Sequence, residues 1–385
     1  MKLSVFPIAL ALATLAVTAR ANDTVFAGGF DPVWVLGYHV GYEADDYPTD
    51  KVDFAAMSHV IIGVVTPNAD GSLNTTFDID TVNGPLWAGN VGAAAHAASR
   101  KALLMIGGAG TIDGWRGAAS DSNRATFAVN LVELAADLGV DGFDLDWEPL
   151  DPSDYPDFIA LAQQLHSNRP SMTLTLPVGW VNSNFQNASS PDPFFGTIAP
   201  LFDRIDIMSY DMEWPKDGWK SCFTAALHGE SATTPSSIDS SVDFYLASGV
   251  PRSKLGIGIG FYGVCWHGVT AARQTIGKNA GIYGSDNAYS YHNIVTQYYS
   301  LANYHYDLPA QAPYLANATA FGPGNGCNFL SYEDAQSIAA KGAYVRRNGL
   351  AGTIIWNIGE GYVPEDVGQE NALLETVNAA FQPTN

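Results

Sequence analysis

The sequence has little positive charge. Its 385 residues include 18 Lys and Arg against 39 Asp and Glu, which gives a formal net charge of −21. A surface this acidic repels phosphate backbones and anionic lipid headgroups. We therefore expect neither nucleic acid nor a membrane surface as a partner. Neutral and cationic ligands remain compatible with this charge.

Cysteine is also scarce. The three cysteines, Cys222, Cys265 and Cys327, do not have the spacing of a zinc site. In an oxidising compartment they allow one disulfide and leave one thiol over, and the sequence alone leaves open whether there is one bridge between loops or none. The sequence indicates no bound metal and no cofactor.

Long apolar runs are absent except near the N-terminus. One lysine precedes a largely apolar stretch, Leu3–Val17, and an A-R-A site ending at Ala21 follows it. The stretch is short for a membrane span, and this arrangement is typical of a secretory signal peptide. We predict a signal peptide over residues 1–21 and secretion of the mature chain, residues 22–385. N-x-S/T sequons stand at Asn22, Asn74, Asn187 and Asn317.

The mature chain lacks a Pro/Ser-rich linker, an internal repeat and a G-x-G-x-x-G turn after its first strand. The missing glycine turn disfavours a nucleotide-binding fold. Short β-branched and apolar runs alternate with amphipathic stretches, which predicts parallel strands joined by helices. About eight such units favour a single (β/α)₈ barrel, with an open doubly wound sheet as the alternative. The predicted strands are Val33–Tyr38, Val60–Val65, Leu103–Ile106, Gly139–Trp147, Met172–Leu176, Arg204–Tyr210, Leu255–Gly260 and Thr353–Trp356.

Helix-terminating signals accompany these elements. Gly139 is predicted to end the helix before it, and Ser153 and Ser236 are predicted N-caps. Clear helical patterns cover Asn123–Leu138, Ser153–His166 and Glu333–Arg347.

One interval breaks the alternation of strand and helix. About seventy residues separate the seventh strand from the next helix, which is too many for a structureless loop in a compact domain. This interval is rich in Tyr, Gly, Asn and Ala. We predict a small α+β subdomain, inserted over residues 262–329 between the seventh strand and the seventh helix.

The stretch DGFDLDWEP, residues 141–149, places carboxylates inside a predicted strand. Alternate side chains of a strand share a face, so Asp144, Asp146 and Glu148 point together toward the barrel mouth, where such barrels carry their chemistry. The interleaved apolar residues and Asp141, at the deep end, point the other way. Crowded carboxylates cannot all ionise at low cost, so Glu148, nearest the mouth, is the candidate general acid. Calcium binding is the alternative, but it favours oxygens that converge from a loop.

These residues carry a resemblance to a known family. The spacing D-x-x-D-x-D-x-E, from Asp141 to Glu148, resembles the signature of the glycoside hydrolase family 18 chitinases. Met208-Ser209-Tyr210-Asp211 resembles the M-x-Y-D motif of that family, and Trp356 matches its late tryptophan. Gly37-Tyr38 and Lys254–Gly263 resemble its first and seventh strands. The resemblance covers essentially the whole mature chain.

The resemblance implies a mechanism without a protein nucleophile, in which the 2-acetamido oxygen of the substrate attacks the anomeric carbon. Glu148 would protonate the glycosidic oxygen and later activate water. Asp146 would hold the acetamido N–H, and Asp144 would share a proton with Asp146. Tyr210 would donate to the acetamido oxygen, and Trp356 would stack under the sugar.

Further positions follow from the same resemblance. It implies that Asp141 is a structural residue behind the site, and that the substrate is chitin and chito-oligosaccharides bound by a monomer. Tryptophans after predicted strands, including Trp219 and Trp266, are each explained as well by packing as by sugar contact. The predicted substrate-binding residues are Trp356, Met208, Asp211, Tyr38, Trp180 and Trp214.

One position departs from the family pattern. The third strand of family members usually ends S-x-G-G, whereas this chain has Met105 at the serine position. We therefore expect a pH optimum different from that of relatives with the serine. Two other functions stay open at this point, namely an endo-β-N-acetylglucosaminidase acting on N-glycans and a non-catalytic chitin-binding lectin. Lectins of this kind usually lack the terminal glutamate, which is present here as Glu148.

Overall fold

The computed structural model describes residues 33–184, 189–229 and 231–382. The predicted signal peptide and the sequons at Asn22 and Asn187 lie outside these residues. Among the helices that are described, none is both long and apolar enough to cross a membrane.

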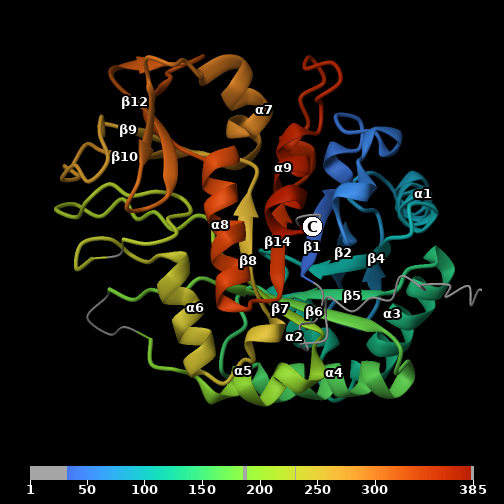
Figure 1. Ribbon diagram of the computed structural model, residues 1–385. Coiled ribbons are helices and arrows are strands. Elements are labelled where there is room, and N and C mark those ends of the chain that lie inside the picture. The colour runs from blue at the N-terminus through green and yellow to red at the C-terminus, as the bar shows by residue number, and fades with distance from the viewer. Residues whose placement is uncertain (1–32, 185–188, 230, 383–385) are drawn as a thin grey trace, which may run out of the picture. The chain divides into compact units, whose positions relative to one another are not determined.

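Within the described chain, eight parallel strands close into a barrel, which confirms the predicted fold class and excludes the open sheet (Figure 1). The pairing of β1 with β2 completes the ring. A short strand, β3 (Leu73–Asn74), adds to β2 in antiparallel fashion. In order around the ring the strands are β1 (Trp34–Val40), β14 (Gly352–Trp356), β8 (Leu255–Gly260), β7 (Arg204–Met208), β6 (Thr173–Gly179), β5 (Gly142–Asp146), β4 (Lys101–Gly107) and β2 (His59–Pro67).

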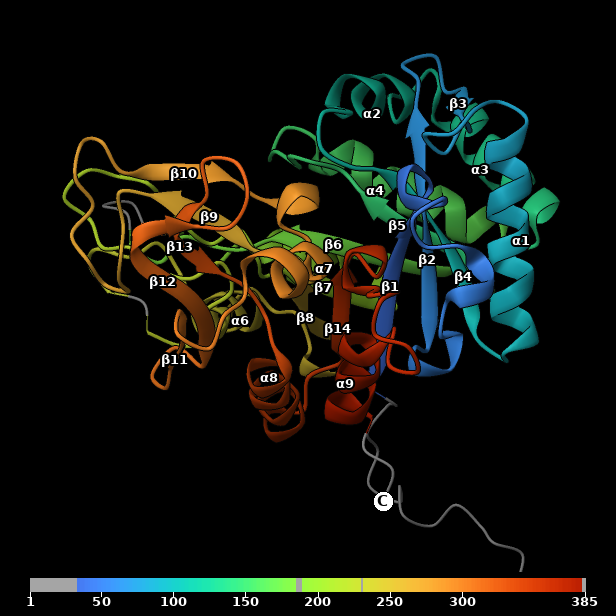
Figure 2. The ribbon, with the colours of Figure 1, turned by 90° about the horizontal axis from the view of Figure 1, so that it is seen from above.

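Helices cover the outside of the barrel, so most strand residues are buried on both faces and the strands show continuous apolar runs. For example, α1 packs against β2 and β4, and α3 packs against α1 and α4 (Figure 2). The helices around the barrel are α1 (Asn83–Ala97), α2 (Ile112–Ala118), α3 (Arg124–Leu138), α4 (Tyr155–Asn168), α5 (Pro193–Ile198), α6 (Ile238–Ala247), α8 (Ala335–Asn348) and α9 (Ala372–Phe381).

The inside of the barrel has its own small apolar cluster. Leu36, Ile61, Leu103 and Ile354 are buried there together with Tyr38 and Met105. Trp34, Val64, Met208 and Trp356 pack against this cluster and are only partly buried.

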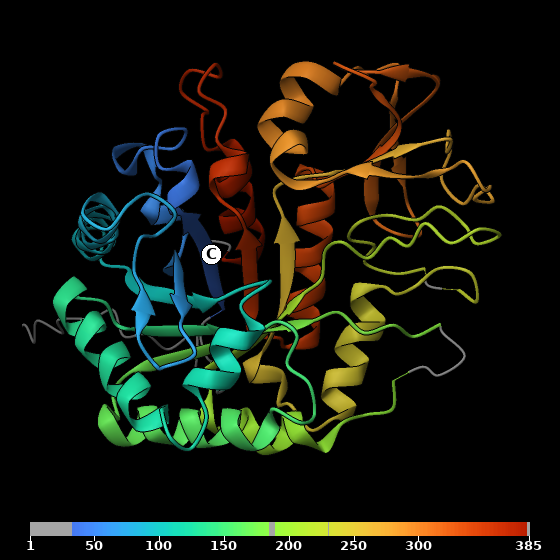
Figure 3. The ribbon, with the colours of Figure 1, turned by 180° about the vertical axis from the view of Figure 1, so that it is seen from behind.

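The predicted insertion follows β8 and is an antiparallel sheet. Its strands lie in the order β10, β9, β13, β12, β11, and a one-turn helix, α7 (Tyr291–Asn293), lies between β10 and β11. The sheet stands on the side toward which the β8 arrow points (Figures 1 and 3). Its strands are β9 (Val264–His267), β10 (Gly281–Gly284), β11 (Tyr304–Asp307), β12 (Ala312–Phe321) and β13 (Cys327–Ser331).

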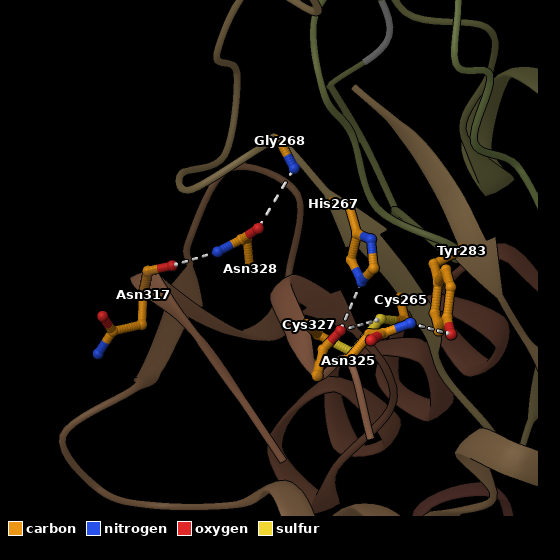
Figure 4. The surroundings of a disulfide bond; sticks show 9 residues. Cys265, His267, Gly268, Tyr283, Asn317, Asn325, Cys327 and Asn328 are labelled. Atoms are coloured by element: carbon orange, nitrogen blue, oxygen red, sulfur yellow. Dashed lines mark hydrogen bonds between the residues drawn. A yellow bond between two sulfur atoms is a disulfide. The ribbon is translucent and has the colours of Figure 1, made fainter. Parts of the chain in front are cut away.

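A disulfide joins Cys265 of β9 to Cys327 of β13, and Cys222 is a buried free thiol. Figure 4 shows the surroundings of this bond. The ring of Tyr283 stacks on His267 with centroids 4.2 Å apart, and Asn325 Nδ2 donates to the Tyr283 hydroxyl at 2.9 Å. The bridge therefore ties together two neighbouring strands of the insertion rather than two loops.

Of the three predicted helix ends, the one at Gly139 is confirmed. The two predicted N-caps, Ser153 and Ser236, are each wrong by one residue. Gly139 ends α3 with φ 69°, in the left-handed conformation that glycine adopts at low cost. The N-cap of α4 is Asp154, not Ser153, and its carboxylate is bound by Arg116 at 2.8 Å. The N-cap of α6 is Ser237, not Ser236, because Ser237 and Ser240 form a reciprocal capping box.

Candidate active site

The acidic strand β5 has the predicted alternation. Asp144 and Asp146 face the barrel interior and are 1% and 3% exposed. Phe143 and Leu145 lie fully buried on the opposite face, in the core between barrel and helices. Because unpaired carboxylates are costly to bury, their hydrogen-bond partners decide which of them carries charge.

Asp144 is fully partnered. The Tyr38 hydroxyl donates to Oδ2 at 2.6 Å, and the Thr175 hydroxyl donates to Oδ1 through a short hydrogen bond. Burial raises the pKa of Asp144 to about 6, although both hydroxyl donors act to lower it. The two donors come from different strands: β6 is the neighbour of β5, and β1 lies in the other direction around the ring, beyond β4 and β2. The barrel therefore fixes this carboxyl from two directions.

Asp146 lies two residues further along β5, closer to the barrel mouth, and is held differently. Its backbone carbonyl accepts hydrogen bonds from Gly108 N at 2.7 Å and from Trp115 Nε1 at 3.1 Å, which anchors the end of β5. Its side-chain Oδ1 is buried and accepts no hydrogen bond from any described residue. Burial, together with the charges of Glu148 and Asp144, raises its pKa well above the usual range. This carboxyl is therefore easier to protonate than a free aspartate.

Glu148 follows β5 at the barrel mouth. Burial raises its pKa above that of a free glutamate, while the neighbouring Asp146 carboxyl acts in the opposite direction. A carboxyl whose pKa is raised toward neutrality is suited to donate a proton to a leaving group and to take one back from water. Glu148 also lines the larger of the cavities at the mouth.

That cavity has a volume of about 700 Å³ and lies over the ends of β5, β6 and β7. Besides Glu148, two of the predicted residues, Met208 and Trp180, line it. Its walls are largely apolar and aromatic, which suits the flat, apolar faces of sugar rings. Lining residues that the sequence did not indicate include Tyr155, Asn182, Asp192, Phe195, Phe244 and Tyr245.

Tyr210 stands just beyond β7, beside the carboxylates. It is 8% exposed, and burial and the charges of Asp146 and Glu148 raise its pKa, so its hydroxyl remains a hydrogen-bond donor. A Cβ on Gly258 of β8 would lie 2.8 Å from Tyr210 Cε1, so the glycine leaves room for the ring. The neighbouring Asp211 accepts from the Tyr262 hydroxyl at 2.8 Å.

Trp356 ends β14 on the other side of the barrel mouth. Its ring lies 5.2 Å from that of Tyr38, and it packs against the apolar cluster inside the barrel while remaining partly exposed. Its position allows the indole to form a floor above the barrel interior. Trp356, Tyr38, Tyr210 and the carboxylates of β5 are therefore brought to one place.

Three of the candidate residues lie elsewhere. Asp141 is at the opposite end of β5, where its carboxylate binds Lys101 Nζ at 2.7 Å and His96 Nε2 at 2.8 Å. Trp214 is 45% exposed on the loop after β7 and does not line the cavity. Trp266 is fully buried in the core of the insertion, which assigns it a packing role.

Thr175 is a site residue that sequence reasoning missed. It faces Asp144 because β6 pairs with β5 in a register that places the two residues opposite each other. The only signal in the sequence is a polar residue at an inward position of a strand. Within the described part of the chain, no group of three or more His, Cys, Asp and Glu side chains is arranged to hold a metal ion.

Residues 35–361 match the family described as Glycosyl hydrolases family 18, and the chain therefore belongs to that family. A "chitinase-like effector" from Moniliophthora roreri is 26% identical, with 92% of this chain and 94% of the relative aligned. A "Class V chitinase" from Arabidopsis thaliana is also 26% identical, with 83% and 84% aligned.

Two solved structures illustrate the shared fold. The Group IV chitinase of Ostrinia furnacalis in complex with allosamidin superimposes with a TM-score of 0.75 at 21% identity, over 90% of this chain and 98% of that chain. The chitinase-like agglutinin RobpsCRA from Robinia pseudoacacia gives a TM-score of 0.71 at 23% identity, over 90% and 99%. The family thus includes chitinases and proteins described only as chitinase-like.

Proposed function

We propose that this chain is a secreted chitinase that hydrolyses β-1,4 bonds between N-acetylglucosamine units with retention of configuration. The observation that carries the proposal is the line of carboxyls from Asp144 through Asp146 to Glu148, which ends in an aromatic-lined cavity. The disulfide between Cys265 and Cys327 supports an oxidising, extracellular destination.

In the proposed reaction, the sugar on the non-reducing side of the cleaved bond lies on Trp356. Glu148 donates its proton to the glycosidic oxygen as that bond breaks. The 2-acetamido oxygen attacks the anomeric carbon and forms an oxazolinium intermediate. Asp146 accepts a hydrogen bond from the acetamido N–H and stabilises the positive charge, while the Tyr210 hydroxyl donates to the acetamido oxygen.

The second half of the reaction reverses these roles. Glu148, now a carboxylate, takes a proton from water, and the resulting hydroxide attacks the anomeric carbon. The acetamido group is regenerated, and the product keeps the β configuration. Asp144 shares one proton with Asp146 and so controls how much negative charge Asp146 presents to the acetamido group.

Two other functions compete with this proposal. A chitin-binding lectin would have the same barrel, and relatives described as an agglutinin and as chitinase-like illustrate that outcome. The presence of a partly buried Glu148 with a raised pKa favours an enzyme, because sugar binding alone does not require a proton donor. An endo-β-N-acetylglucosaminidase acting on N-glycan cores would use the same residues on another substrate.

Chromatography of products from chitohexaose tests the proposal. We expect shorter chito-oligosaccharides from the purified protein and none from a Glu148→Gln control. Binding of chitohexaose without cleavage would identify a lectin instead. Cleavage of an N-glycan glycopeptide but not of chitohexaose would identify the second activity and overturn the proposal.

A further inference from the structure

A second cavity, of about 340 Å³, lies on the opposite side of the barrel mouth from Glu148. It lies over β1 and β14, which are across the ring from β5 and β6, and the insertion contributes one wall through α7. It shares no lining residue with the larger cavity. The lining residues are Glu43, Asp46, Asn287, Ser290, His292, Asn293, Gly359, Glu360, Tyr362 and Pro364.

Two carboxyls of this second cavity are buried without adequate partners. Glu43 is 7% exposed, and Asn357 Nδ2 donates to its Oε1 at 3.3 Å, but its Oε2 accepts no hydrogen bond from a described residue. Glu360 is 2% exposed, and neither of its carboxyl oxygens accepts one. A buried carboxyl left in this state is costly, so such groups mark a place where a ligand completes the hydrogen bonding.

The charges around the second cavity have one sign. Burial raises the pKa of Glu43 to about 7, and burial with the charge of Asp286 raises that of Glu360 to about 11. Among the described lining residues there is no Lys or Arg, and His292 is already paired with Glu365 at 3.0 Å. A bound cation would let these carboxyls ionise, whereas an anion would meet them at close range.

The second cavity is linked to the catalytic centre through Asp286. This carboxyl lies between Glu360 and the indole of Trp356, and contacts with both lower its pKa against the effect of burial. The exposed ring of Tyr42, adjacent to Glu43 in the chain, stands near the same carboxyls. In the proposed reaction Trp356 carries the sugar just before the cleaved bond. The second cavity therefore lies where earlier sugars of the chain, on the non-reducing side, would pass.

We propose that the second cavity binds the protonated amino group of a glucosamine unit, so that the preferred substrate is partly deacetylated chitin. This inference rests on the proposed chitinase function and narrows its substrate. The reaction requires an acetamido group only on the sugar over Trp356. A free amine on a unit further toward the non-reducing end is compatible with catalysis, and Glu43 and Glu360 supply its counter-charge.

Sequencing the products of a partly deacetylated chitosan by NMR and mass spectrometry tests this inference. We expect N-acetylglucosamine at every new reducing end and glucosamine enriched at the second or third unit from it. The preference is measured as kcat/KM for the chitosan divided by kcat/KM for chitohexaose. A hydrogen bond to a charged group contributes about 1.5–3 kcal/mol. Glu43→Gln and Glu360→Gln should therefore each lower this ratio by roughly tenfold. Asp137→Asn, an equal charge change at an exposed site on α3, should leave that ratio as it is.

The outcomes separate the inference from the function on which it rests. Failure to cleave chitohexaose at all would overturn the chitinase proposal. Cleavage of chitohexaose without enrichment of glucosamine in the chitosan products would overturn only the second cavity's role. If Asp137→Asn also lost the preference for chitosan, that preference would come from the overall charge of the protein. This result too would overturn the role of the second cavity.

A binding measurement on the wild-type protein does not depend on the folding of any variant. Calorimetry with the fully deacetylated glucosamine trimer, at pH 6 in two buffers of different ionisation enthalpy, should show binding with release of a proton to the buffer. The positive charge of the bound ammonium group favours the ionised form of Glu43, which is protonated at this pH in the free protein. Absence of binding, or binding without proton release, would contradict the inference.

Discussion

The Tyr38 hydroxyl lies 2.6 Å from Oδ2 of Asp144 and donates a hydrogen bond to it. With Thr175 on the other oxygen, Asp144 is fixed inside the barrel, whereas Oδ1 of Asp146 accepts nothing from the described residues. The Asp144 carboxyl is thus held in place by two protein hydroxyls, whereas Oδ1 of Asp146 can accept a hydrogen bond from a substrate. This asymmetry explains how neighbouring carboxyls on one strand can have separate roles.

Replacing Thr175 with Val should shift the pH dependence of activity. The hydroxyl favours the ionised form of Asp144, so its loss raises the apparent pKa of the Asp144–Asp146 pair. The acid limb of kcat/KM against pH should move to higher pH by roughly one unit, given about 1.5 kcal/mol or more for a hydrogen bond to a charged group. Thr173→Val, on the same strand, is the control. An unmoved acid limb would show that Thr175 does not set this pKa.

Met105→Ser tests the same carboxyl pair from β4. Met105 is paired in register with Asp144 and is 2% exposed. A serine hydroxyl there adds a donor, so the acid limb should move to lower pH, opposite to the Thr175 variant. An unchanged pH–rate profile would refute the expectation that the methionine gives this chain a distinct optimum.

Glu148→Gln should remove nearly all turnover. The amide keeps the shape of the side chain but cannot donate the proton, and a positioned general acid contributes about 10²–10⁴-fold. Binding of chitohexaose should persist, which separates lost chemistry from lost folding. Glu133→Gln, an exposed glutamate on α3, provides the matched control. Near-normal kcat in Glu148→Gln would remove this residue from the mechanism.

Asp206→Asn should stabilise the protein more as pH rises. Asp206 is 1% exposed inside the barrel, neither carboxyl oxygen accepts a hydrogen bond from a described residue, and burial raises its pKa to about 8. Between about pH 4 and pH 8 the folded state keeps a proton that the unfolded state loses, so the stability of the wild type falls with pH over this window. The asparagine side chain does not titrate, so the variant does not lose stability in this way. Urea unfolding at pH 5 and pH 8 gives the difference in the free energy of unfolding between variant and wild type. An equal difference at the two pH values would show that the pKa of Asp206 is not raised.

Two glycine-to-alanine substitutions should have opposite effects on stability. Gly139 has φ 69°, and an added methyl group would meet no atom within 4 Å, so Gly139→Ala should destabilise by about 1 kcal/mol through backbone conformation alone. Gly89 lies inside α1 with ordinary contact distances, so Gly89→Ala should stabilise by about 0.5–1 kcal/mol. Urea unfolding measures both, and destabilisation by both substitutions would show that steric contacts outweigh backbone preference.

Most of the fold was predictable because strand and helix periodicities are local. The eight strands follow from apolar runs such as Leu255–Gly260, and the helix end at Gly139 follows from a backbone preference of one residue. The N-caps at Asp154 and Ser237 were missed by one residue because adjacent polar residues compete. In those cases a tertiary partner, Arg116, or a reciprocal bond with Ser240 decides the choice.

The candidate site was predictable only along single strands. Asp144, Asp146 and Glu148 share a face by alternation, but their partners come from other strands. Thr175 reaches Asp144 through strand register, and Glu43 meets Glu360 only because β1 and β14 are neighbours in the closed ring. Neither relationship leaves a signal in sequence spacing. The acidic second cavity therefore emerges only from the three-dimensional structure.

The most direct test of substrate-assisted retention is an NMR time course of chitohexaose hydrolysis that records the anomer released first. Attack by the acetamido oxygen followed by water gives two inversions at the anomeric carbon, so the β-anomer should appear first and convert to α only by later mutarotation. Initial release of the α-anomer would mean a single direct attack by water and would contradict the mechanism assigned to Asp146, Tyr210 and Glu148.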